Sequence, residues 1–275
     1  MNNQSKVSII IPTYNRMHFL ENAIKSIKIQ TYKNIEIIVV DDNSSDNTTD
    51  VVKKLNNKNI EIIYLRNDIN KGVSATRNIG IKQATGKYIL TLDDDNLLVP
   101  WAIDKLVKKI KQSKLDNLGG AYGWLWCMGE NGKTLRIITE RSNSLIKREI
   151  FENVGFYNED LRNNEDLDFW LRVAKKYQFD YVPEILFVAK SHGQNQLSEF
   201  SKKNIKEYKE ISDKYQVKSY KNNIWITNFV SKKTYIILSK IKNIFLVKIK
   251  LLFFPELKKN IELVKNSFIQ NDVNL

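Results

Sequence analysis

The first 92 residues alternate between short runs typical of β-strands and longer stretches with the spacing of amphipathic helices. Runs rich in Ile, Val and Leu occur at residues 7–11, 35–40, 60–65 and 88–92. Between the first two runs, apolar residues recur at helical spacing, namely Leu20, Ala23, Ile24 and Ile27. Strands separated by such helices form βαβ units, whose right-handed crossovers place helices on both faces of a parallel sheet. We therefore predict an α/β fold with a mostly parallel sheet sandwiched by helices.

Polar loops follow these strands, and the carboxyl ends of parallel strands meet at one edge of the sheet. Thr13 follows the first strand, Asp42 the second, and Asp93-Asp94-Asp95 the fourth. Ligands of open α/β sheets bind beyond such strand ends. In an extended chain, Asp93 and Asp95 would point to one side and Asp94 to the other. Two carboxylates in one crevice favour a hard divalent cation, Mg²⁺ or Mn²⁺, that also binds substrate phosphates. A solvated acidic turn is the alternative.

Glycine-rich phosphate loops are absent from the sequence. No G-x-G-x-x-G follows the first strand, and neither G-x-x-x-x-G-K-[ST] nor G-x-S-x-G occurs anywhere. These absences argue against a dinucleotide dehydrogenase, a P-loop enzyme and an α/β-hydrolase. A bound diphosphate would therefore need another source of positive charge, which a metal ion on the central carboxylates can supply.

Composition narrows the class of protein further. One cysteine and two histidines exclude an internal disulfide and a Cys/His zinc site, and they favour a reducing compartment. The N-terminus lacks a signal-peptide pattern, and no apolar stretch is long enough to span a membrane. We therefore expect a cytoplasmic protein.

The net charge of +13 is concentrated at the C-terminal end. Residues 201–275 hold 16 lysines, no arginine and 6 acidic residues, and so account for +10 of the total. We therefore expect a catalytic domain at residues 1–197 and a basic helical extension at residues 198–275. Lysine without arginine or aromatic platforms argues against nucleic-acid binding.

The C-terminal extension contains two predicted helices. An apolar stripe flanked by lysines runs from Leu238 to Leu252, and a second helix is expected at residues 256–268, after Pro255. The stripe is typical of a helix lying on an anionic membrane, which would place the protein peripherally on the inner face of the cell membrane. Packing on the catalytic body and a homo-oligomer contact are the alternatives.

Several motifs, taken in order, resemble glycosyltransferase family 2. They are SIIIPTYN at 8–15, QTY at 30–32, EIIVVDDNS at 36–44, NKGVSATRN at 70–78, LDDD at 92–95, VGFYNED at 154–160 and EDLDFWLR at 165–172. Each motif is weak alone, but their order and spacing over roughly residues 7–195 make the resemblance specific. It implies a GT-A type, Rossmann-like fold and the transfer of a sugar from a nucleotide diphosphate.

The resemblance also implies a nucleotide-binding set. Asp42 matches the family carboxylate that accepts a hydrogen bond from the base, usually uracil, whereas Asp41 is expected to be structural. Thr13 and Asn15 are expected near the base or ribose. Arg77 matches an arginine near the base and diphosphate, where a guanidinium fork suits phosphate oxygens. An exposed helix cation is the alternative for Arg77.

A metal site is implied at the acidic motif. Asp95 matches the main metal ligand, and Asp93 and Asp94 are assigned to donor binding. Many family members have a further acid where this chain has Asn96, which leaves the ligand set incomplete. His192 matches a histidine that can reach the metal or the diphosphate, with a plain loop histidine as the alternative.

A second pair of carboxylates, Glu165 and Asp166, opens a predicted helix. Favourable interaction with the helix dipole would explain either acid. The resemblance instead identifies Asp166 as the base that takes the proton from the acceptor hydroxyl, with Glu165 orienting it or binding acceptor. Further acceptor contacts are expected from Trp124, Trp126 and Asn143. For the two tryptophans, packing in the core is the alternative.

The leading hypothesis is therefore a metal-dependent, inverting transferase. It would move a hexosyl or N-acetylhexosaminyl group from a UDP-sugar to a hydroxyl of a surface glycan or lipid-linked saccharide. A sugar nucleotidyltransferase is an alternative, but it should carry a glycine-rich basic loop where this chain has residues 12–15. A non-catalytic nucleotide-sugar binding protein is the third possibility.

Overall fold

The computed structural model describes residues 4–56, 60–129, 134–161, 163–190, 210–211, 214, 255–271 and 273. Its strands are β1 (Val7–Thr13), β2 (Ile35–Asp41), β3 (Glu61–Arg66), β4 (Tyr88–Thr91), β5 (Asn96–Leu98), β6 (Leu118–Met128), β7 (Thr134–Lys147) and β8 (Gln178–Lys190). Its helices are α1 (Met17–Lys28), α2 (Thr48–Leu55), α3 (Val73–Gln83), α4 (Ala102–Gln112), α5 (Glu149–Val154), α6 (Glu165–Ala174) and α10 (Pro255–Ile269).

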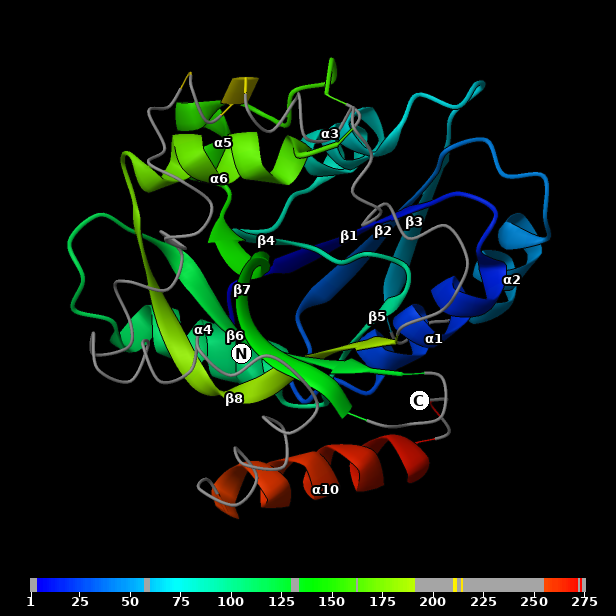
Figure 1. Cartoon of the computed structure of the whole chain (residues 1–275). Helices are drawn as coiled ribbons and strands as arrows, with labels where there is room; N and C mark the ends of the chain where they lie inside the picture. The colour runs from blue at the N-terminus through cyan, green and yellow to red at the C-terminus, as the bar shows by residue number, and fades with distance from the viewer. Residues whose placement is uncertain are drawn as a thin grey trace.

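One sheet joins the described strands in the order β3-β2-β1-β4-β7-β6-β8-β5 (Figure 1). The predicted parallel half is confirmed, because β1 pairs in parallel with β2 and β4, and β2 with β3. The second half is mixed: β7 runs antiparallel to β4 and β6, and β5 runs antiparallel to β8. Because β6 and β8 again pair in parallel, parallel pairs outnumber antiparallel pairs among the described strands, and the prediction of a mostly parallel sheet is confirmed.

The parallel strands align their carboxyl ends. Thr13 on β1 lies opposite Asp41 on β2, and the Leu92 N–H donates to Ile10 O at 2.9 Å just beyond β4. The loops that follow β1, β2 and β4 therefore start at the same edge of the sheet, as the α/β pattern predicts.

Helices cover both faces of the sheet (Figure 1). Ile9 and Ile11 pack into one core with residues of α1, α4 and α10, whereas Ile10 packs into a second core with residues of α3, α5 and α6. Alternate residues of β1 thus serve opposite faces. The α3 packing is close, since a Cβ at Gly80 would lie 2.5 Å from Ile10 Cγ2.

The last described helix packs on the body of the protein. Ile261, Val264 and Phe268 of α10 are buried in the same core as Trp126, and Lys265 Nζ lies 5.7 Å from the centre of the Trp126 ring. The predicted helix after Pro255 is therefore present, and its apolar face serves packing. The stripe at residues 238–252 lies outside the described residues. Among the helices that are described, none combines the length and apolar character needed to cross a membrane.

Candidate active site

The three consecutive acids after β4 lie in a tight turn. The Asn96 N–H donates to Asp93 O at 3.0 Å, and β5 begins directly at Asn96. The extended-chain alternation expected for these acids is therefore wrong, because the chain reverses there to pair with β8. Instead, Asp94 and Asp95 share one cation: Arg16 Nη1 lies 3.2 Å from Asp94 Oδ1 and 3.2 Å from Asp95 Oδ2.

Asp94 ties this acid turn to the end of β1. The Thr13 hydroxyl donates to Asp94 Oδ2 at 2.8 Å, and both side chains are buried. Burial raises the pKa of Asp94 to about 7, and the charge of Asp95 adds to this effect, while Arg16 and Thr13 oppose it. Arg16 was not singled out from the sequence, although its place between the β1 loop and α1 was a signal that could have identified it.

Arg77 joins the acid turn to the second pair of acids. Its Nη2 donates to Asp93 Oδ1 at 2.7 Å, and its Nη1 donates to Glu165 Oε1 at 2.6 Å. Burial alone would lower the pKa of Arg77, but Asp93 and Glu165 hold it well above its usual value. The structure thus brings two groups of predicted site residues together through an arginine that both groups share.

The two acids that open α6 have different surroundings. Asn164 adopts a left-handed conformation with φ of 57°, and the helix starts at the next residue. Glu165 is buried against Arg77, whereas Asp166 is partly exposed and accepts a hydrogen bond from the Leu167 N–H at 2.7 Å. Asp166 is therefore the acid of this pair that is more accessible to an acceptor.

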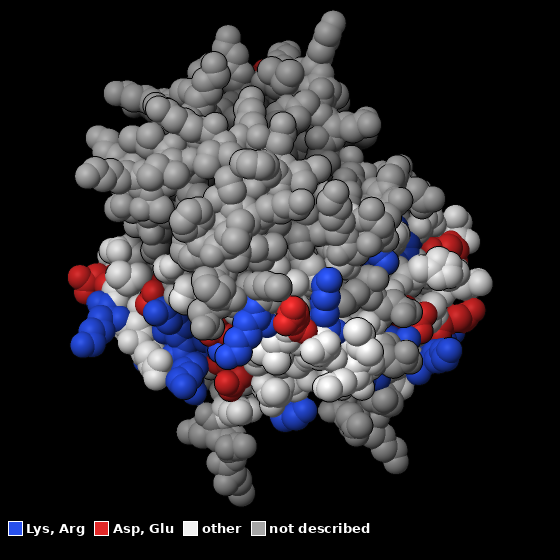
Figure 2. Space-filling view, turned by 60° about the horizontal axis from the view of Figure 1, so that its bottom comes forward, with Lys and Arg blue, Asp and Glu red and all other residues white. Residues whose placement is uncertain are grey.

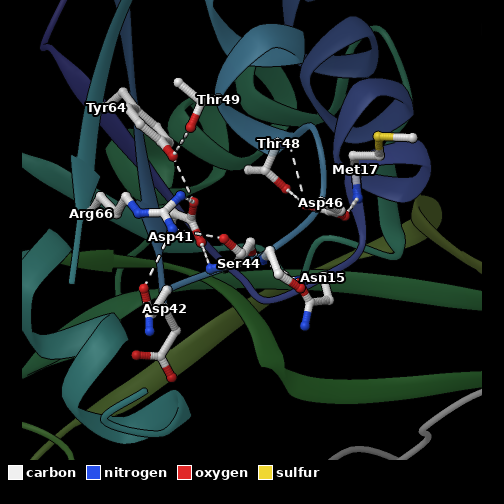
Figure 3. Close-up of polar contacts among 12 residues, drawn as sticks. Asn15, Met17, Asp41, Asp42, Ser44, Asp46, Thr48, Thr49, Tyr64 and Arg66 are labelled. Carbon is white, nitrogen blue, oxygen red and sulfur yellow. Dashed lines mark hydrogen bonds and ion pairs between the residues drawn. The ribbon is translucent and has the colours of Figure 1, made fainter. Parts of the chain in front are cut away.

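Asp41 is fully buried and is the centre of a hydrogen-bond network at the end of β2 (Figure 3). It accepts hydrogen bonds from Ser44 N at 2.8 Å, Tyr64 Oη at 2.6 Å and Arg66 Nη1 at 3.2 Å. The expected structural role of Asp41 agrees with these contacts. The network fixes the loop after β2 to β3.

Asn15 and Asp46 connect the loop after β1 with the loop after β2. Asn15 has a φ of 54°, and its Oδ1 accepts a hydrogen bond from Ser45 N at 2.7 Å. Asp46 accepts from Met17 N at 3.0 Å and so caps the start of α1 from the neighbouring loop (Figure 3). These hydrogen bonds connect the loop after β1 to the loop after β2.

The Asp42 carboxylate points away from the Asp41 network (Figure 3). Its Oδ1 accepts from Asn67 Nδ2 and Lys71 N, and its Oδ2 accepts from Gly72 N, each at 2.8 Å. Asp42 therefore holds the loop that leads into α3. A carboxylate oxygen can accept twice, so Oδ2 retains capacity for one more donor. The base contact assigned to Asp42 stays a prediction.

The residues assigned to acceptor binding are only partly accessible. Trp126 is fully buried in the core, so the core alternative applies and its assignment to the acceptor is corrected. Trp124 on the same strand is partly exposed. Asn143 is buried, and its Oδ1 accepts from Asn96 Nδ2 at 3.4 Å, so both amides are held beside the acid turn.

A cavity of about 220 Å³ opens beside Asp95. Its lining combines polar and apolar side chains: His18, Phe19, Asn22, Asp95, Leu97 and Lys190. His192 lies outside the described residues, two positions beyond Lys190. The cavity therefore adjoins the acid turn on the side that faces α1 and the end of β8.

The acid turn fits a hard cation in its donor chemistry. The side chains of Asp93 and Asp95 are 49% and 20% exposed, so both can offer oxygen atoms to a ligand. Within the described ranges, no three His, Cys, Asp or Glu side chains are grouped so as to hold a metal. The two carboxylates match the oxygen ligands that Mg²⁺ prefers, and such sites commonly hold the ion by one or two carboxylates together with substrate phosphates and water.

A mixed α/β sheet, an acid turn after the fourth strand and a second acid pair at a helix start are the features expected from the resemblance to GT-A type glycosyltransferases. Comparison with known families agrees with this class. Residues 8–163 match the model of glycosyl transferase family 2. The chain belongs to this family and is a glycosyltransferase.

Two relatives illustrate the range of similarity in sequence. An uncharacterized glycosyltransferase of Methanocaldococcus jannaschii is 28% identical over 256 residues, which cover 84% of this chain and 87% of the relative. The GalNAc(5)-diNAcBac-PP-undecaprenol beta-1,3-glucosyltransferase of Campylobacter jejuni is 35% identical over 197 residues, which cover 63% of this chain. The match spans only 61% of the Campylobacter enzyme's length.

Two solved structures share the fold. S. aureus TarS 1-349 in complex with UDP-GlcNAc has a TM-score of 0.61 at 18% identity, covering 76% of this chain and 66% of TarS 1-349. A mannosyltransferase from Pyrobaculum calidifontis, in complex with GDP-Man and Mn²⁺, has a TM-score of 0.52 at 20% identity, covering 69% of this chain and 57% of that enzyme. At such low identity these similarities concern the fold alone.

Proposed function

We propose that this glycosyltransferase moves a sugar from UDP to a hydroxyl of a surface-glycan or lipid-linked saccharide, with inversion and with the help of a divalent cation. One observation carries the proposal: Arg77 connects the acid turn after β4 directly to the acid pair that opens α6. A diphosphate-binding centre and a base for the acceptor would thus lie at one edge of the sheet.

The choice of donor and acceptor class draws on the comparisons. TarS was solved with UDP-GlcNAc, and the Campylobacter relative is named for a lipid-linked saccharide acceptor. The Pyrobaculum enzyme was solved with GDP-Man, which makes a GDP-sugar the second candidate. A UDP-sugar is favoured because Asp42 matches the carboxylate that usually accepts from uracil.

Asp95, with Asp93, would hold the cation. Bound there, Mg²⁺ or Mn²⁺ would supply positive charge for the departing diphosphate. In the structure Arg16 Nη1 lies 3.2 Å from Asp95 Oδ2, so a cation bound at Asp95 would compete with this ion pair. The predicted ligand His192 remains part of the proposal.

Asp166 would accept the proton of the acceptor hydroxyl as that oxygen attacks the anomeric carbon. A hydroxyl is a weak nucleophile, and removing its proton during attack lowers the barrier. Attack from the side opposite the leaving diphosphate inverts the anomeric centre. Glu165 cannot easily take this role, because Arg77 holds it in a buried ion pair.

The alternatives lack comparable support. A sugar nucleotidyltransferase would need a basic glycine-rich loop after β1, whereas Thr13 there donates to Asp94. A binding protein without activity would not need a partly exposed acid beside the buried Arg77–Glu165 pair. A measurement of sugar transfer distinguishes such a binding protein from the proposed enzyme.

The direct test is the Asp166→Asn variant. After thermal-shift screening of UDP-glucose, UDP-GlcNAc and GDP-mannose with Mg²⁺ or Mn²⁺, transfer to saccharide acceptors is measured with the donor that stabilises most. We expect Asp166→Asn to lower kcat by roughly 10²–10⁴-fold, because the general base is lost. Its donor Kd should stay within about twofold of the wild-type value, since the base acts on the acceptor.

Asp116→Asn provides the matched control, because Asp116 is an exposed acid in the loop before β6. This variant should behave as the wild type does. Full transferase activity of Asp166→Asn would remove Asp166 as the base. An absence of stabilisation by any of the three donors would count against the proposed donor class.

A further inference from the structure

Several polar side chains of helix α3 point into the protein interior. Ser74, Thr76, Arg77 and Asn78 are all buried, although serine, threonine, arginine and asparagine are mostly exposed in proteins. Buried polar groups are costly unless they are hydrogen-bonded. The positions of their partners therefore indicate what this helix does.

Thr76, Asn78 and Arg77 each bond to a different segment of the chain around the site. Thr76 Oγ1 donates to Gly72 O at 2.8 Å and accepts from Asn67 Nδ2 at 3.4 Å, at the loop that Asp42 also holds. Asn78 exchanges two hydrogen bonds with the backbone of Tyr157, at 2.9 and 3.0 Å. The segment that leads to α6 is thereby fixed to α3.

Among these side chains, Arg77 connects the segments that lie farthest apart in the sequence. One nitrogen reaches Asp93 in the acid turn, and the other reaches Glu165 at the start of α6, 88 positions later in the chain. An arginine that clamps a diphosphate presents both nitrogens of its fork to the same anion. Here Nη1 and Nη2 bond to two different protein carboxylates and the side chain is buried, so the fork is not presented to a single anion.

We propose that Arg77 is a positioning residue that sets the separation between the acid turn and the start of α6. It acts through Asp93 and Glu165 and does not contact the donor. Glu165 is adjacent to Asp166, so the orientation of the acceptor base depends on this bridge. The inference rests on the proposed function in taking Asp166 as the base, and it replaces the diphosphate role that family resemblance implies for Arg77.

Removal of Arg77 would leave the Asp93 and Glu165 carboxylates without the cation they share. Like charges then repel, and the start of α6 would move away from the acid turn. Lysine would retain the charge, but an ammonium group cannot reproduce the planar fork that spans two carboxylates. Both effects alter alignment at the site and leave the nucleotide pocket between β1, β2 and the loop at residues 67–72 in place.

The test compares the full-length variants Arg77→Gln, Arg77→Lys, Glu165→Gln and the double variant Arg77→Gln/Glu165→Gln. A misplaced catalytic group costs roughly 10²-fold, so each glutamine variant should lower kcat by about that factor. The double variant should be no slower than the slower single variant, because both changes break one bridge. Arg77→Lys should recover part of the loss.

Binding of UDP and UMP separates positioning from phosphate contact. If Arg77 only positions, Arg77→Gln changes the Kd of both nucleotides by less than about threefold and to the same extent. Arg148→Gln is the control, because Arg148 follows β7 next to the start of β4, at the opposite edge of the sheet. It should match the wild type in kcat and in both Kd values.

Two results would overturn the inference. One is a much larger loss of UDP affinity than of UMP affinity in Arg77→Gln, which would show a β-phosphate contact. The other is a double variant whose loss equals the product of the two single losses. Should Arg77→Gln fail to fold, Glu165→Gln and Arg77→Lys provide the test. A lowered kcat with unchanged UDP affinity in these variants supports the inference, and an unchanged kcat refutes it.

Failure of the proposed function would look different. A wild-type chain that neither binds UDP nor transfers a sugar refutes the donor assignment and leaves the bridge to be measured without a ligand. In that case the urea unfolding midpoints of the same variants are compared in a double-mutant cycle. Non-additive shifts for Arg77 and Glu165 support the bridge, and additive shifts refute it.

Discussion

Acidic residues of this protein differ in what neutralises them. Asp41 and Glu36 are fully buried and are bound by fixed groups of the scaffold. Asp93, Asp95 and Asp166 keep part of their surface exposed. The first group can only stabilise the fold, whereas the second group can also bind or react.

Glu36 should make the protein sensitive to acid. Burial alone would raise the pKa of Glu36, but hydrogen bonds from Lys6, Ser8 and Thr85 outweigh burial and lower it to about 2. A carboxylate with a lowered pKa in the folded state stabilises above its ordinary value of 4.5, and this contribution is lost as the pH falls toward 2. The shift corresponds to about 3 kcal/mol.

Urea unfolding between pH 7 and pH 2.5 measures this contribution. The free energy of unfolding should fall across the window below pH 4.5 more steeply in the wild type than in Glu36→Gln. Glu61→Gln is the control, since Glu61 is exposed beside Lys6. Parallel pH dependences for the wild type and Glu36→Gln would contradict the prediction.

At the scale of elements, the loop at residues 67–72 depends on one side chain. Asp42 accepts from Asn67, Lys71 and Gly72, and the last residue has a φ of 86° at the start of α3. Gly72 suits this position because it has no Cβ. The loop, α3 and the predicted base contact therefore share a single carboxylate.

Asp42→Ala should lower both stability and nucleotide affinity. The loss of an acceptor for three N–H groups should cost about 2–3 kcal/mol of the free energy of unfolding. Asp68→Ala, at an exposed position of the same loop, should change neither property. Urea unfolding and UDP titration measure the two effects. Weaker UDP binding at unchanged stability would mean that Asp42 contacts the base and does not hold the loop.

At the scale of the whole molecule, the C-terminal end of the chain completes the main core. Phe268 of α10 is fully buried in the cluster that contains Trp126 and residues of α1 and α4. On the face shown in Figure 2, the described basic and acidic side chains are interspersed. The predicted membrane contact belongs to residues outside those described, and it stays a prediction.

Phe268→Ala should destabilise the entire domain. The loss of a buried phenylalanine side chain costs about 3–4 kcal/mol, and unfolding should remain a single transition because α10 shares the core. Leu263→Ala, on the exposed side of the same helix, should change the free energy of unfolding by less than about 0.5 kcal/mol. A separate early transition in wild-type unfolding would indicate an independent C-terminal unit.

Local sequence pattern was sufficient for much of the architecture. The period of apolar residues predicted β1 to β4 and their helices, and the acid pair at residues 165–166 was correctly placed at a helix start. These features depend on neighbours within a few positions, which the sequence displays directly. The motif resemblance likewise identified the family, which the match at residues 8–163 confirms.

Tertiary structure alone decided how the acids are used. Asn96–Leu98 is too short to show a strand pattern, yet its pairing with β8 bends the chain and breaks the alternation expected for Asp93–Asp95. The ion pairs of Arg77 with two carboxylates also depend on residues far away in the chain. The same holds for the burial of Trp126 in a core that α10 completes. Periodicity reports which face of an element is apolar, whereas the partner of a buried charge is set by which elements the fold brings together.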